Sequence, residues 1–212
     1  MLRLAVTGGV ATGKSSVLAA LAARGVPVID LDQLCRQVLQ PGGSILERIR
    51  ISFGEEFAPG AAFLDRARMR QLITTDADAR KRLEAIVHPP VMDLMEARLR
   101  EVEAAGHDLA AVEVPLLYEA GYRPLFDVVV VAACPRETAL GRLMARGGLS
   151  RREAEALVAT QLPMEEKVAR ANYVIDTTAS SSAVALSVER ILQVVLSTSA
   201  KAKKSGEEKV GR

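Results

Sequence analysis

Residues 8–15 have the types and spacing that suit the binding of phosphate groups. Their sequence, GGVATGKS, fits the pattern GxxxxGK[ST] and lies between an apolar run and an amphipathic stretch that carries Val17, Leu18 and Leu21. Glycines let backbone amides turn toward one point, a helix start adds positive potential, Lys14 adds a charge, and the Ser15 hydroxyl can bind magnesium. The segment predicts a loop that holds a nucleotide β-phosphate. A chance glycine-rich turn beside a solvated lysine is the plainer alternative.

Two carboxylates, Asp30 and Asp32, follow the apolar run Val26–Ile29. In an open α/β sheet, ligands bind at the carboxyl ends of the strands. A carboxylate there can accept a proton from an acceptor hydroxyl or orient it toward the γ-phosphorus. Asp32 is the first candidate for this role, because Asp30, with Gln33 three residues later, also resembles the capping pair of a helix.

Five short apolar runs must position these groups. They lie at residues 2–6, 26–29, 109–114, 128–131 and 173–175 and read as strands buried on both faces. Helical stretches separate them, and the clearest apolar stripe is formed by Val91, Leu94, Met95, Leu99 and Val102. Alternating strands and helices predict a doubly wound α/β fold.

The connection between the second and third runs is far longer than a crossover needs, so it predicts an inserted subdomain over residues 32–108. Helices are expected there around residues 44–53, 65–73, 77–87 and 90–105, with Pro89-Pro90 separating the last two. A second segment, residues 142–167, is rich in Arg and Glu and predicts either a mobile lid or an ordinary surface helix pair. Residues 200–212 read as a disordered tail, and residues 1–31 with 109–199 as the core.

Composition narrows the function classes. The chain has 212 residues, 49% of them hydrophobic, and a net charge of +2, which suits anionic ligands and falls short of a nucleic-acid binder. Cys35 and Cys134 lie far apart, which predicts reduced thiols. Neither a signal peptide nor a membrane-spanning run is visible, so the chain is expected to be cytoplasmic, with a small-molecule partner and no nucleic acid or membrane partner.

The sequence resembles the dephospho-CoA kinase family over nearly all of residues 1–179. The matching segments, in order, are TGGVATGKSS, VIDLDQLCRQVLQPGG, IVHPPV, EVPLLYEAG, FDVVVV, RLMARGGLS, QLPMEEK and ANYVID. The resemblance implies an α/β, three-layer P-loop NTPase fold with a parallel sheet, an inserted helical acceptor-binding subdomain and a helical lid. It also implies transfer of the ATP γ-phosphate to the ribose 3′-hydroxyl of dephospho-CoA, in a monomer or weak homo-oligomer.

The resemblance also implies roles for individual residues. Asp32, Lys14 and Arg142 would be catalytic, and Ser15 would bind Mg²⁺. ATP would contact Gly8, Gly9, Ala11, Thr12, Gly13, Lys14, Ser15, Ser16, Arg142 and Arg146. The acceptor would contact Asp30, Arg36, His88, Leu116, Leu117 and Glu119. Each of these residues also has a plainer explanation. His88 could end a helix, the arginines could lie on a solvated basic face, and Glu119 could cap a short helix.

Four positions depart from the family pattern. Ala11 stands where glycine is usual, Gly147 replaces Asp or Asn, Leu157 replaces an arginine of the lid helix, and Thr177 replaces an asparagine. Leu157 cannot contact a phosphate, so Arg151, Arg152 or Arg170 would have to substitute for it. Thr177 puts an adenine-side contact in doubt.

Three other functions stay open. Another P-loop small-molecule or nucleotide kinase would have the same loop. A binding protein that has lost catalysis is a second possibility, because Leu157 stands where the family has an arginine. A regulatory NTPase switch is disfavoured because no NKxD-like segment appears and the third strand ends in Val112-Glu113-Val114-Pro115 rather than in Asp-Glu.

Overall fold

The computed structural model describes the backbone of residues 1–210 and the side chains of residues 1–198. The chain forms two compact units. The first contains residues 1–29 and the chain from Val102 onward, and the second contains residues 30–101. The expected insertion had boundaries at 32 and 108, and its role in binding an acceptor stays a prediction.

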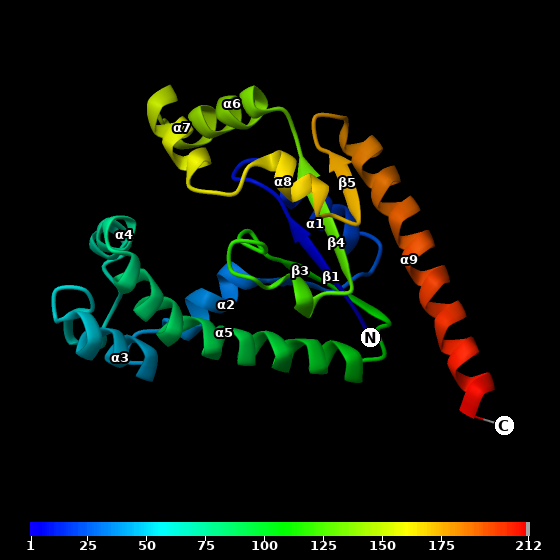
Figure 1. Ribbon diagram of the computed structural model, residues 1–212, viewed down its shortest axis with the longest axis horizontal. Helices are drawn as coiled ribbons and strands as arrows, with labels where there is room; N and C mark the ends of the chain where they lie inside the picture. The colour runs from blue at the N-terminus through cyan, green and yellow to red at the C-terminus, as the bar shows by residue number, and fades with distance from the viewer. Residues whose placement is uncertain (211–212) are drawn as a thin grey trace. The chain divides into compact units, whose positions relative to one another are not determined.

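A five-stranded sheet forms the centre of the first unit (Figure 1). The strand order is β2-β3-β1-β4-β5, and β1 pairs in parallel with β3 and β4, as β4 does with β5. All five predicted runs are strands, and the α/β prediction is confirmed. Their bounds are β1 Leu2–Thr7, β2 Val28–Asp30, β3 Leu109–Glu113, β4 Val128–Ala133 and β5 Tyr173–Asp176.

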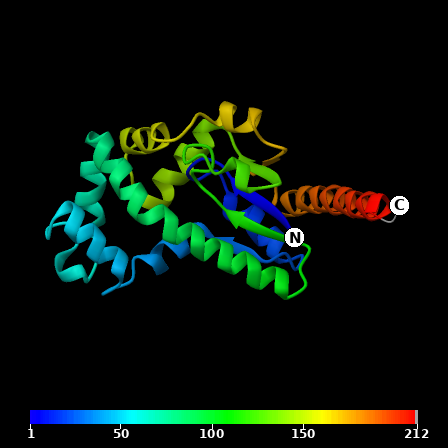
Figure 2. The ribbon, with the colours of Figure 1, turned by 60° about the horizontal axis from the view of Figure 1, so that its bottom comes forward.

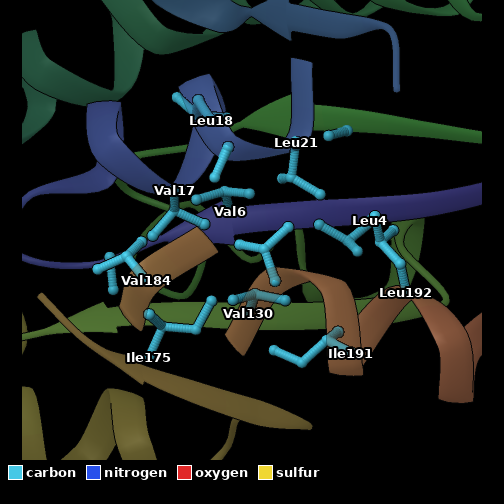
Figure 3. Packing of buried hydrophobic residues seen from close by; sticks show 14 of the residues in the cluster. Leu4, Val6, Val17, Leu18, Leu21, Val130, Ile175, Val184, Ile191 and Leu192 are labelled. Carbon is cyan, nitrogen blue, oxygen red and sulfur yellow. The ribbon is translucent and has the colours of Figure 1, made fainter. Parts of the chain in front are cut away.

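One face of the sheet is covered by helices α1 (Lys14–Ala22) and α9 (Ser181–Val210). Because strand side chains alternate between faces, Leu4 and Val6 of β1 point to the same side. Figure 3 shows them between Val17, Leu18 and Leu21 of α1 and the α9 side chains Val184, Ile191 and Leu192. This buried cluster fixes the start of α1 against the end of β1.

The edge strands differ from the expectation of burial on both faces. Val28 of β2 and Val174 of β5 are exposed, whereas Val129, Val130 and Val131 of β4 are buried. The difference arises because β2 and β5 lie at the two margins of the sheet, where helices cover less of the strand.

Three helices lie between β4 and β5 in the first unit, and a short 3-10 turn, η2 (Arg123–Leu125), comes before β4. Helix α6 spans Arg136–Gly147, α7 spans Arg151–Ala159 and α8 spans Met164–Ala169. Gly148, in the left-handed conformation, ends α6, and a capping box between Ser150 and Glu153 begins α7. The predicted lid, residues 142–167, covers the last part of α6, all of α7 and the start of α8; its mobility stays a prediction.

The second unit is helical, with α2 (Leu31–Val38), α3 (Ser44–Phe53), the 3-10 turn η1 (Pro59–Ala61), α4 (Arg66–Thr75) and most of α5 (Ala77–Ala104). The predicted helices at 44–53 and 65–73 are therefore confirmed. The predicted break at Pro89-Pro90 is wrong, because α5 runs through both prolines. Each proline removes one N–H from the helix ladder. Buried residues on both sides, Ile86 and Val87 before the prolines and Val91, Met95 and Leu99 after them, hold the helix together.

Helix α9 replaces the expected disordered tail as far as Val210, and residues 211–212 lie outside the described residues. In both views α9 continues past the end of the sheet (Figures 1 and 2). Its last part is rich in Ala, Lys and Glu, which have high intrinsic helix propensity. Within the described residues, no helix combines the length and apolar character needed to cross a bilayer.

Candidate active site

The predicted phosphate loop joins β1, which ends at Thr7, to α1, which begins at Lys14. Gly13 caps α1 in a left-handed conformation, with φ 86°, and no side chain caps the first turn. The first turn also contains no acidic residue. Its backbone N–H groups and the positive end of the helix dipole are therefore suited to an anion.

Two glycines of the loop are required by close packing. A Cβ at Gly8 would collide with the carbonyl oxygen of Ala132 on the neighbouring strand β4. A Cβ at Gly13 would lie 2.8 Å from the side chain of Thr177, which follows β5. The loop therefore passes directly over the ends of β4 and β5, and larger residues would push it away from them.

The loop opens onto a cavity of about 420 Å³. It is lined by Ala11, Gly13, Lys14, Ser15, Ser16, Glu113, Arg142 and Arg146. The Lys14 ammonium donates to the carbonyl oxygens of Gly9 at 3.0 Å and Gly8 at 3.4 Å. The sequence prediction placed seven of these eight residues, all but Glu113, at a nucleotide site.

Arg142 and Arg146 reach the cavity from α6, where their spacing of four residues places them on one helix face. Arg142 also binds the loop region: its Nη2 donates to the Thr177 carbonyl oxygen at 2.7 Å, and its Nη1 lies 3.4 Å from the carbonyl oxygen of Ala11. Arg146 is exposed. The cavity thus combines two guanidinium groups with one ammonium, a set that suits a polyanion.

Glu113 is a cavity residue that sequence reasoning did not select. It ends β3, the strand beside β1. In the sequence, the Val112-Glu113-Val114-Pro115 segment indicates only that the strand does not end in Asp-Glu. The signal that could have revealed it is position, since the carboxyl ends of adjacent parallel strands lie together at one edge.

Ala11 adopts a positive φ of 57° in the middle of the loop. For a residue with a Cβ, this left-handed conformation costs roughly 1–2 kcal/mol. The departure from glycine noted in the sequence therefore falls on a position whose backbone favours glycine. The loop keeps the conformation in spite of this strain.

Glu119 forms an ion pair with a buried lysine. Its Oε1 lies 2.8 Å from the ammonium of Lys167 and accepts a 2.9 Å hydrogen bond from the Leu162 N–H. Lys167 has an exposed fraction of 0% and also donates to the Pro115 carbonyl oxygen at 3.3 Å. The pair joins the segment after β3 to α8. In this arrangement Glu119 holds the end of the predicted lid.

The other predicted acceptor residues are distributed over both units. Leu117 is fully buried, so of the two leucines only Leu116 presents its side chain at the surface. In the second unit, Asp30 caps α2 by accepting from the Gln33 N–H at 3.0 Å, as the capping interpretation predicted. Asp32 and Arg36 are exposed on one face of α2, and His88 is half-buried on α5.

Both cysteines are free thiols. Cys134 follows β4, and burial raises the pKa of its thiol although the nearby Arg142 acts in the opposite direction. Burial likewise raises the pKa of Cys35, with Arg66 acting against it. Both thiols are therefore protonated at neutral pH, which argues against a catalytic thiolate.

The family model for dephospho-CoA kinase matches residues 2–183. The chain belongs to the dephospho-CoA kinase family. Among curated relatives, it is 43% identical to a dephospho-CoA kinase of Anaeromyxobacter dehalogenans over 189 residues, 89% of this chain and 90% of that protein. The family match extends over the phosphate loop, the helical second unit and the lid segment.

Solved structures support the same family and confirm the P-loop kinase fold. The structure of TT1252 from Thermus thermophilus is similar with a TM-score of 0.80 and 34% identity, over 93% of this chain and 97% of that chain. A dephospho-CoA kinase from Campylobacter jejuni gives a TM-score of 0.66 and 26% identity, over 91% and 96%. The resemblance inferred from short motifs therefore extends to the whole family fold.

Proposed function

We propose that this protein transfers the γ-phosphate of ATP to the ribose 3′-hydroxyl of dephospho-CoA, forming coenzyme A and ADP. The observation that carries the proposal is the cavity at the start of α1. There an uncapped helix terminus meets Lys14, Arg142 and Arg146. The family membership supplies the acceptor, since the relatives are named for phosphorylating dephospho-CoA.

The residues of the cavity have separate parts in binding the triphosphate. Backbone N–H groups of the loop bind the β-phosphate, and Lys14 donates to the phosphate oxygens in place of its present carbonyl acceptors. Arg142 and Arg146 approach from the α6 side and offset the negative charge of the transferred group. Lys14 and Arg142 are held by hydrogen bonds before ATP arrives, which reduces reorganisation during transfer.

The residues present fit a magnesium ion. The Ser15 hydroxyl and the Glu113 carboxylate line the same cavity and are oxygen ligands of the kind Mg²⁺ prefers, directly or through water. Magnesium, when bound, neutralises charge on the β- and γ-phosphates. Ser15 was the predicted ligand, and Glu113 is added here.

In the proposed transfer, the 3′-oxygen forms a bond to the γ-phosphorus while the bond from that phosphorus to the bridging oxygen of ADP breaks. The hydroxyl proton passes to a carboxylate, for which we propose Asp32. Asp32 lies in the first turn of α2 and is exposed, as a residue that meets an acceptor must be. Arg36, one turn further on the same helix, is proposed to contact the phosphates of the acceptor.

The test is ADP release by the full chain with ATP and magnesium, measured without acceptor and with dephospho-CoA, nucleoside monophosphates, shikimate or gluconate. The proposal predicts release that depends on dephospho-CoA and far exceeds release with any other acceptor. Equal release without acceptor would instead indicate an NTPase switch. Release stimulated by another acceptor would indicate a different small-molecule kinase.

A further inference from the structure

Thr177 is a buried polar residue that contacts the phosphate loop from the end of β5. Its exposed fraction is 7%. Its Oγ1 donates to the Thr12 carbonyl oxygen at 2.5 Å, and its N–H donates to the Ala133 carbonyl oxygen at 2.9 Å. The residue therefore joins the end of β4 to the turn of the loop. The family resemblance suggested only an adenine-side position for it.

The contact acts on a particular peptide group of the loop. In a planar trans peptide, the C=O of one residue and the N–H of the next point in opposite directions. Because the Thr12 carbonyl oxygen is held toward Thr177, the N–H of Gly13 points to the opposite side. Gly13 lines the cavity, so this geometry directs its N–H toward the proposed phosphate position.

Arg142 fixes the orientation of Thr177 in turn. Its Nη2 donates to the Thr177 carbonyl oxygen at 2.7 Å, and its Nη1 lies 3.3 Å from the Thr177 Oγ1. The hydroxyl has one proton and accepts from Arg142, so its own proton is directed to a carbonyl acceptor. Of the two carbonyl oxygens within reach, that of Thr12 at 2.5 Å is closer than that of Ala133 at 3.1 Å. Thr177 also packs closely on Gly13, since a Cβ at Gly13 would lie 2.8 Å from its side chain.

We propose that Thr177 is a positioning residue for nucleotide binding, whose hydroxyl holds the Thr12–Gly13 peptide so that the Gly13 N–H faces the triphosphate. The proposal rests on the proposed function, because ATP is the assumed ligand of the cavity. Thr177 itself does not touch the reacting atoms in this account. Its effect is on the affinity for ATP.

The decisive variant is Thr177→Val, which removes the hydroxyl and keeps the shape of the side chain. We expect the Kd of a non-hydrolysable ATP analogue, measured by calorimetry with magnesium, to rise about ten-fold. The KM for ATP should rise by a similar factor, with the KM for dephospho-CoA unchanged. Thr177→Ser keeps the hydroxyl and should restore binding to within about two-fold of the natural protein.

Thr178→Val is the matched control. The Thr178 hydroxyl bonds to Asp176 at 2.7 Å, on the same connection but without contact to the loop. Its loss should leave ATP affinity unchanged. If Thr177→Val fails to fold, Thr177→Ala removes the same hydroxyl without placing a second methyl group beside the Thr12 carbonyl.

The outcomes separate this inference from the proposed function. If the natural protein binds no ATP analogue, the proposed function is wrong and the inference falls with it. If the natural protein binds ATP and Thr177→Val binds it equally well, only the inference is overturned. Equal losses in Thr177→Val and Thr178→Val, or no rescue by Thr177→Ser, would also overturn it.

Discussion

At the scale of single residues, the charge of Lys14 is held by the loop it serves. Its ammonium donates to two loop carbonyls, Gly8 and Gly9, so it is positioned before a phosphate arrives. We expect Lys14→Ala to lower kcat/KM for dephospho-CoA phosphorylation about 100-fold or more, since one positioned electrostatic contact is worth roughly 3 kcal/mol. Steady-state kinetics measure this, and a loss below about three-fold would remove Lys14 from the mechanism.

Ala11 allows a prediction about stability. Ala11→Gly relieves the left-handed strain, offset in part by the greater chain entropy of glycine in the unfolded state. The free energy of unfolding should increase by about 0.5–1 kcal/mol in urea titrations. Ala19→Gly, on the exposed face of helix α1, is the control and should decrease it by a similar amount. A decrease in the free energy of unfolding in both variants would show that the Ala11 backbone is not strained.

The sequence allowed prediction of some of these residues and not of others. Lys14, Ser15 and Gly13 are recognisable because their function depends on neighbours within one short loop. Glu113 and Thr177 act through strand neighbours that only the tertiary fold brings to the loop. No local pattern marks them.

At the scale of elements, the ion pair between the partly exposed Glu119 and the buried Lys167 joins the segment after β3 to α8. Glu119→Gln leaves the buried Lys167 ammonium without its counter-charge and should lower the free energy of unfolding by about 2 kcal/mol. Glu166→Gln, which breaks an exposed pair between α8 and its C-cap residue Arg170, should lower it by at most about 0.5 kcal/mol. Equal losses of stability in the two variants would show that the burial of Lys167 does not strengthen its ion pair.

The same pair predicts a pH dependence. Burial acts to raise the pKa of Glu119, but hydrogen bonds from Lys167 and from the Leu162 N–H outweigh it, so the folded-state pKa is lowered. The pair therefore adds stability above the ordinary glutamate pKa, and this stability is lost as the pH falls through the lowered value. Acid titration of thermal stability should be less steep in Glu119→Gln. An identical slope of thermal stability against pH in the two proteins would show that the protonation of Glu119 is not linked to stability.

The predicted lid has its own test in Arg146, which lines the cavity from the end of α6. Arg146→Ala should raise the KM for ATP about five-fold and lower the ratio of transfer to hydrolysis, because a water-excluding contact is lost. Arg190→Ala, an exposed arginine of α9 that does not line this cavity, is the control. Unchanged ratios in Arg146→Ala would count against the lid.

Element boundaries were predictable where local signals are strong. Helix α3 has the predicted bounds because glycines stand directly before Ser44 and after Phe53. Helix α5 was divided wrongly at Pro89-Pro90, because a proline rule is local and the buried stripe that sustains the helix is not. The sequence also did not predict that β2 and β5 lie at the margins of the sheet, because strand order is a property of the whole sheet.

At the scale of the whole molecule, the two compact units predict a separation of effects. Asp32 belongs to the second unit, whereas every residue lining the cavity belongs to the first. Asp32→Asn should therefore lower kcat by about 100-fold, the usual range for a general base, and leave the Kd of an ATP analogue unchanged. Calorimetry and single-turnover kinetics test the two parts. A matching loss of ATP affinity would place Asp32 in nucleotide binding instead.

The most direct test of the proposed function is phosphorus NMR of a reaction that contains the full chain, ATP, magnesium and dephospho-CoA. We predict that one new phosphomonoester resonance, that of a ribose 3′-phosphate, and the ADP resonances grow in equal amounts, and that both grow at least about 100-fold more slowly with Lys14→Ala. Growth of ADP with inorganic phosphate and without the phosphomonoester would contradict the assignment of this chain as a kinase of dephospho-CoA.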